Sequence, residues 1–119
     1  MTDLEIDLAV ALAWESMPDW KPSRFNNHPT VSPAGFWQWT VASFTNIGEG
    51  SWEPVPATSP QIWTKCLGWL LKTGIRIDTH SYNFETQLWT EVSVSGEYAP
   101  IGKFASAVIV CFLKAKGKA

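Results

Sequence analysis

The residue types best suited to binding chemistry occur at the start of the segment 58–74. Thr58 and Ser59 supply hydroxyl groups, and Pro60 suits the first position of a helix, where its missing N–H removes no hydrogen bond. The first turn of such a helix presents free backbone amides and the positive end of the helix dipole. A phosphate group is stabilised in that position, so the segment is a candidate anion site.

Aromatic and cationic residues nearby extend this candidate site toward nucleotides. Trp52 or Trp63 could stack on a base, and Arg76 or Lys103 could neutralise a phosphate. The simpler interpretation is ordinary helix capping beside a core Trp63, and both interpretations stay open. The predicted ligand-binding residues are Trp52, Thr58, Ser59, Trp63, Arg76, His80 and Lys103.

A catalytic alternative rests on Asp78 and His80. They lie two residues apart in a predicted strand, so they share one face, and the carboxylate could orient the imidazole as a base. A polar outer strand face is the simpler explanation of the pair. The sequence contains no HExxH, GxSxG, Walker or GxGxxG motif, and Cys66 and Cys111 lack metal-ligand spacing. We therefore expect a protein without enzymatic activity, metal or cofactor.

Tryptophan is unusually abundant for a chain of 119 residues. A core of this size cannot fully bury eight large rings whose N–H groups each need a partner. Some are therefore expected to line a groove or a subunit interface. Trp69, Val110 and the strand around Trp37 are candidates for such a surface, which predicts a homo-oligomer. The tryptophans are Trp14, Trp20, Trp37, Trp39, Trp52, Trp63, Trp69 and Trp89.

Three helices are predicted to position these residues, near 2–17, 59–73 and 100–115. Thr2 and Glu5 form a capping-box pattern, and Gly74 is placed to end the second helix. The first helix is expected to bury a stripe of Leu4, Leu8, Ala11 and Leu12. In the last helix, Ile101, Phe104, Ala105, Val108 and Phe112 form the expected apolar face, and Val110 lies opposite it.

Strands are predicted near 36–44, 75–81 and 87–95, where apolar and polar residues alternate. The last two are expected to form a hairpin through Asn83. Proline and asparagine residues between 18 and 50 indicate a long loop or insertion, and 46–56 reads as turns. The chain is therefore predicted to be one α+β domain, 1–119, with about three helices packed on a small antiparallel sheet in a helix–sheet–helix sandwich.

Charge and hydropathy exclude several partner classes. The net charge of −2 is unlike that of strong nucleic-acid binders, and no apolar run is long enough for a membrane span. The acidic residues Asp3, Glu5 and Asp7 argue against a signal peptide, which predicts a cytoplasmic protein.

Several segments resemble the phage ABA-sandwich domain family of small phage and prophage proteins. The likeness lies in residues 8–11 with Trp14, in residues 58–60 with Trp63, and in Gly74, Trp89 and residues 107–113. Ser59 stands where the family often has aspartate, so a role for a carboxylate does not carry over. The resemblance implies a sandwich fold and a phage protein acting in an infected cell.

Two functions follow as expectations. The first, by analogy with phage proteins that counter host defence, is a non-enzymatic protein that sequesters a cyclic-nucleotide or ADP-ribose-like immune signal. The alternative is a protein–protein inhibitor or assembly module acting on a host protein through an aromatic surface.

Overall fold

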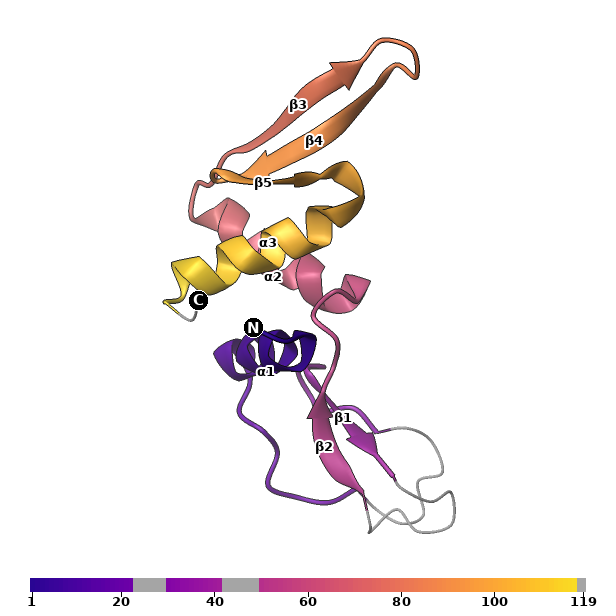
Figure 1. Ribbon diagram of the computed structural model, residues 1–119. Helices are drawn as coiled ribbons and strands as arrows, with labels where there is room; N and C mark the ends of the chain where they lie inside the picture. Colours follow the sequence, from indigo (N-terminus) through magenta and orange to yellow (C-terminus); the bar gives the residue numbers. More distant parts are fainter. Residues whose placement is uncertain (23–29, 42–49, 118–119) are drawn as a thin grey trace. The chain divides into compact units, whose positions relative to one another are not determined.

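A computed structural model describes residues 1–22, 30–41 and 50–117 and divides the chain into two compact units, 1–57 and 58–119 (Figure 1). The described residues contain three α-helices and two antiparallel sheets, which confirms the α+β class. Much of the predicted 18–50 loop, including His28, lies outside the described residues, as do positions 42–44 of the first predicted strand.

In the first unit, α1 (Asp3–Trp14) begins with the predicted capping box. The Thr2 hydroxyl accepts from the Glu5 amide at 3.2 Å, and the Glu5 carboxylate accepts from the Thr2 amide at 3.3 Å. These hydrogen bonds from Thr2 lower the pKa of the Glu5 carboxyl. At pH values above the normal pKa of glutamate, the ionised Glu5 side chain therefore stabilises the start of the helix. This stabilisation is lost as the pH falls through the lowered pKa of Glu5.

The predicted buried face of α1 is confirmed at Ala11 but wrong for its three leucines. Leu4, Leu8 and Leu12 are exposed, whereas Val10 and Ala11 are buried. The helix contacts β2 (Ser51–Pro54), and Asp7 accepts a hydrogen bond from the Ala57 amide at 2.8 Å. This bond turns the Asp7 side of the helix inward. The smaller residues next to it therefore form the packed face, and the leucine stripe points elsewhere.

The sheet of the first unit pairs β1 (Trp37–Thr40) with β2. Trp39 and Trp52 are register partners, and their rings meet nearly edge to face at 5.4 Å. An isolated two-stranded sheet is marginally stable, so an aromatic pair across it is a substantial part of what holds it. The sequence predicts turns in the segment that contains β2, because Pro54 and Pro56 disfavour a strand. The structure nevertheless forms a strand there.

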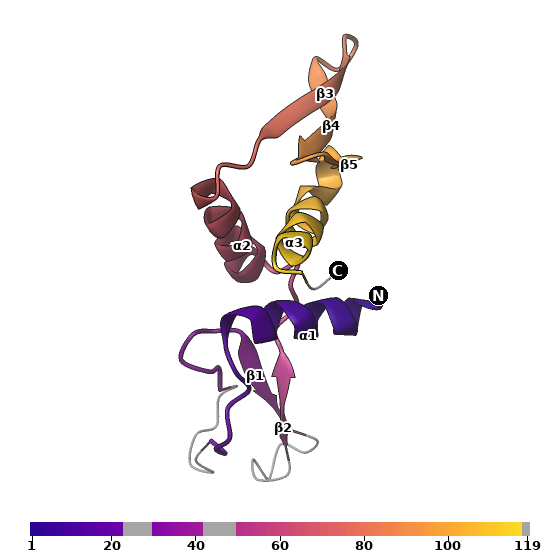
Figure 2. The same cartoon turned by 90° about the vertical axis from the view of Figure 1, so that its left-hand side faces the viewer.

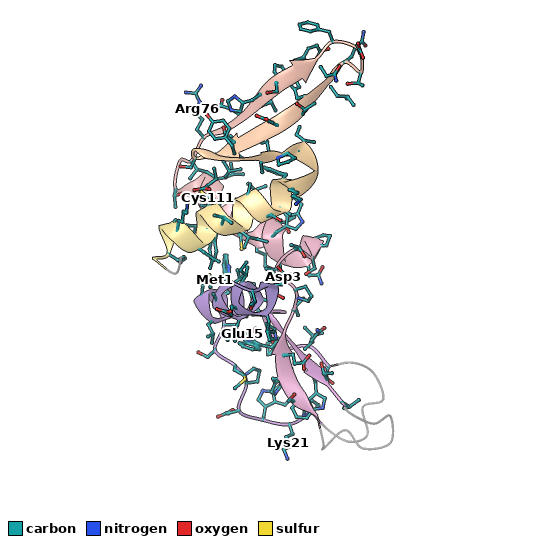
Figure 3. The ribbon with its side chains drawn as sticks, viewed as in Figure 1. Met1, Asp3, Glu15, Lys21, Arg76 and Cys111 are labelled. Atoms are coloured by element: carbon teal, nitrogen blue, oxygen red, sulfur yellow. The ribbon has the colours of Figure 1, made fainter. Side chains whose placement is uncertain are left out.

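Glu15, the residue after α1, joins that helix to the segment before β1 (Figure 3). Its carboxylate accepts hydrogen bonds from the Ser32 hydroxyl at 2.7 Å and from the Ala34 and Phe36 amides, each at 3.3 Å. The Trp37 indole donates to the Glu15 carbonyl at 3.1 Å. One side chain therefore fixes a stretch that has no regular structure of its own.

The second unit begins with α2 (Pro60–Lys72), whose boundaries match the prediction closely. Ser59 is the N-cap in an extended conformation, Pro60 occupies the first turn, and Gly74 has the positive φ of 81° that ends such helices. Ile62, Cys66 and Leu70 are buried.

The second sheet has the order β3 (Ile77–Asn83), β4 (Leu88–Val94) and β5 (Glu97–Pro100). The predicted hairpin through Asn83 is confirmed: its side-chain oxygen accepts from the Glu85 and Thr86 amides at 2.9 and 3.2 Å. The sequence prediction missed β5. Ser95 and Gly96, both with positive φ, connect it to β4 in a two-residue turn.

A short 3₁₀ turn, η2 (Ile101–Lys103), leads into α3 (Phe104–Ala115). This helix contacts α2 as well as β4 and β5 (Figure 2), so it is buried on more than one side. The predicted one-sided apolar face is therefore too narrow, and Ile101 is exposed although it was assigned to that face. Val110 is half-buried. The buried residues of α3 are Ala107, Val108, Ile109, Cys111, Phe112 and Leu113.

Candidate functional site

The predicted ligand-binding residues comprise one residue of the first unit and two groups in the second unit. Trp52 belongs to the first unit, where its indole donates to the Trp20 carbonyl at 2.8 Å and its ring meets those of Trp20 and Trp39. The other predicted residues belong to the second unit, in two groups. Trp52 therefore forms part of an aromatic cluster that supports the first sheet.

One group lies where α2 and α3 begin. The Trp63 ring packs edge to face against Phe104 at 5.7 Å, and farther along the helices Trp69 packs against Phe112 at 5.4 Å. These two contacts show that the helices run in broadly the same direction, so both begin at one end of the pair. Thr58 and Ser59 before α2 and Lys103 before α3 are thereby brought to the same end.

The second group lies on the sheet. Arg76 is exposed just before β3 and forms an ion pair with Asp78 at 2.8 Å (Figure 3). His80 Nε2 lies 2.8 Å from the Ser93 hydroxyl, and its ring lies 5.0 Å from Tyr98. Asp78 and His80 thus each contact a different residue. Ser93, which sequence reasoning did not single out, is buried, and its contact with His80 anchors the imidazole to the sheet.

Phe84, the most exposed aromatic residue of the described chain, lies at the far end of the β3–β4 hairpin, in a surface that the sequence did not predict. The side chain of Tyr82 meets both Phe84 and Trp89, with ring centroids 5.0 Å apart in each contact. Phe84 is 84% exposed, Leu88 63% and Trp89 46%. We call Tyr82, Phe84, Leu88 and Trp89 the tip cluster.

The sheet register explains why the tip cluster is exposed. β5 pairs only with residues 91–94 of β4, so the hairpin beyond that point has two strands (Figure 1). Every residue from 81 to 91 is exposed. Ser81 and Gln87 have positive φ values of 60° and 57°, which are unusual for residues with side chains. The signal available in the sequence was the placement of aromatic and aliphatic residues on both sides of the Asn83 turn.

The cysteines of the second unit are buried. Burial raises the pKa of the Cys111 thiol, and the nearby Glu97 carboxylate adds to this increase, so the thiol stays protonated near neutral pH. Within the described ranges, no three His, Cys, Asp or Glu residues group as metal ligands would. None of the helices in the described residues is long and apolar enough to cross a membrane.

Comparison of the sequence and fold with protein-family models, curated proteins and solved structures finds no match.

Proposed function

We propose that this chain is a protein-binding or assembly module that engages its partner through the tip cluster, without catalysis. The observation that carries the proposal is the exposure of Tyr82, Phe84, Leu88 and Trp89 together on a ribbon that extends past α2 and α3 (Figure 2). Exposed apolar clusters of this kind mark interaction surfaces, and tyrosine and tryptophan are enriched among the residues that dominate binding energy.

The arrangement of side chains at the end of the hairpin also suits binding to a partner protein. Its aromatic rings already contact one another, so little side-chain freedom is lost when a partner covers them. The Asn83 turn and the hydrogen bond from the Thr90 hydroxyl to the Ser81 carbonyl at 2.7 Å stabilise the end of the ribbon. A partially preorganised aromatic tip is well suited to bind the surface of a partner protein.

Site-specific photo-crosslinking tests this proposal. A photoreactive phenylalanine analogue at position 84 should give a discrete protein adduct in cells that produce the chain. The same analogue at Leu12, an exposed apolar residue of α1, serves as the matched control. The adduct should disappear when Trp89→Ser is added. Absence of any adduct from position 84, or equal adducts from both positions, would contradict the proposal.

A second candidate function rests on the converging starts of α2 and α3. Thr58, Ser59 and Lys103 lie at the end where Trp63 and Phe104 pack, a combination of hydroxyls, cation and aromatic edges that suits a nucleotide-derived anion. In a phage-encoded protein, the corresponding role would be sequestration of a host immune signal.

A thermal-shift screen with cyclic dinucleotides, cyclic trinucleotides and ADP-ribose isomers tests this second function. A ligand present at about 100 times its dissociation constant should stabilise the chain by about 2.7 kcal/mol. Lys103→Gln should reduce the shift, whereas Lys72→Gln at the other end of α2 should leave it unchanged. Lack of stabilisation by any member of the panel would remove this candidate.

A further inference from the structure

The acidic and basic residues of the second unit are separated by position in the fold. All of its Asp and Glu residues fall between 77 and 100, the strands and their turns, where there is no Lys or Arg. Residues 58–76 and 101–119, which contain the helices, carry Lys and Arg and no acid. The acids are Asp78, Glu85, Glu91 and Glu97, and the cations are Lys65, Lys72, Arg76, Lys103, Lys114, Lys116 and Lys118.

Some of these charges are neutralised within the unit. Asp78 pairs with Arg76, and Glu97 pairs with Lys114. Glu85 and Glu91 have no ion pair among the described residues, and both are exposed beside the tip cluster. The tip is therefore apolar, aromatic and negatively charged.

The opposite combination is found on the helices. Lys65, Trp69 and Lys72 are spaced so that they share one face of α2, and the Lys116 ammonium lies 4.4 Å from the centre of the Trp69 ring. Trp69 is half-buried, while the three lysines are exposed. We call these four residues the basic patch; it combines the partly exposed Trp69 ring, which Lys116 covers on one face, with three exposed positive charges.

We propose that the tip cluster of one copy docks on the basic patch of a second copy, so that the chain assembles head to tail. This inference rests on the proposed function, since it names the partner of the tip cluster. Electrostatic complementarity fixes which surfaces meet, and the aromatic rings supply apolar area to bury. The paired strands hold the tip about 20 Å along the ribbon from where β3 begins, so the ribbon presents it to another molecule.

Head-to-tail contacts leave one tip and one patch unsatisfied at the ends of every assembly. The average mass should therefore rise continuously with concentration, without a plateau at the dimer unless the assembly closes into a ring. Added salt should lower the mass, because the exposed charges are screened within about 10 Å at 0.1 M.

A charge-swap experiment on the full chain tests the inference by sedimentation. Glu85→Lys with Glu91→Lys makes the tip basic, and Lys72→Glu with Lys116→Glu makes the patch acidic. Each double variant should self-associate about tenfold more weakly than the wild type. An equimolar mixture should recover association, because each tip then meets a patch of opposite charge.

All four positions are exposed, so the variants should retain the wild-type circular dichroism spectrum. The neutral substitutions Glu85→Gln and Glu91→Gln provide a second series that should weaken association less. A monomeric wild type, double variants that associate like the wild type, or a folded mixture that fails to recover would each overturn the head-to-tail inference. If position 84 still crosslinks to a different protein in that case, the proposed function stands with another partner.

Discussion

Replacing Phe112 with alanine is expected to destabilise the chain by about 3–5 kcal/mol, as for other fully buried aromatic residues. Phe112 is 0% exposed and packs against Trp69, and its helix α3 contacts both α2 and the sheet. The substitution would leave a cavity lined by large side chains that cannot easily collapse. Urea unfolding followed by circular dichroism should show the midpoint falling sharply.

Phe84→Ala is the matched control, since it is the same substitution in the same unit at an 84% exposed position. We expect its free energy of unfolding to stay within about 0.5 kcal/mol of the wild type. Self-association should nevertheless decrease. A loss of stability comparable to that of Phe112→Ala would mean that the tip cluster serves the fold rather than a partner.

Glu15→Ala is expected to have the second-largest effect, a loss of about 3 kcal/mol from the first unit. It removes the acceptor of three hydrogen bonds and leaves the buried Ser32 hydroxyl without its carboxylate partner. Hydrogen bonds to charged groups contribute about 1.5–3 kcal/mol each, although losses within one network do not add. The near-ultraviolet circular dichroism of Trp37, held by the same segment, should weaken.

Two other substitutions test whether the Glu15 carboxylate and its hydrogen bonds cause the expected loss of stability. Glu15→Gln keeps an acceptor oxygen but loses the charge, so it should lie between the wild type and Glu15→Ala. Glu53→Ala removes an exposed carboxylate that accepts only from the Thr40 hydroxyl among the described contacts, and it should change stability little. If Glu53→Ala proved as damaging as Glu15→Ala, the Glu15 network would not be what fixes the segment before β1.

The elements that sequence analysis predicted best have strong local signals. Pro60 and Gly74 mark the ends of α2, where Ser59 occupies the N-cap position but its side chain makes no capping hydrogen bond. Thr2 and Glu5 define the start of α1, because a capping box depends only on residues within one turn. The Asn83 turn is also local, since one side chain satisfies the amides two and three residues ahead.

The elements that were missed depend on contacts distant in sequence. β2 forms because Trp52 pairs with Trp39 across the sheet, despite the prolines that follow it. The hydrogen bond from the Ala57 amide to Asp7 determines which side of α1 is buried. This contact joins residues far apart in sequence, so the periodicity of the helix cannot reveal it. The extent of the buried surface of α3 was underestimated, because a helix that packs on two sides has no single apolar stripe.

The candidate site was predicted only in part for the same reason. Thr58, Ser59 and Lys103 reach the same end of the helix pair because α2 and α3 run in broadly the same direction, which is a tertiary feature. The tip cluster depends on β5 being shorter than the hairpin beside it. Without that register, Tyr82 and Trp89 read as ordinary residues of a half-buried sheet.

Fluorine NMR of the chain labelled with 5-fluorotryptophan tests the central claim most directly, that the tip cluster is the docking surface for a second copy. Trp89→Phe and Trp37→Phe assign the two informative signals, one from the tip and one from a residue that is 1% exposed. As concentration rises from low micromolar to near-millimolar at low salt, the Trp89 signal should shift or broaden while the Trp37 signal stays fixed. A Trp89 signal that stays unchanged over the whole range would contradict the account.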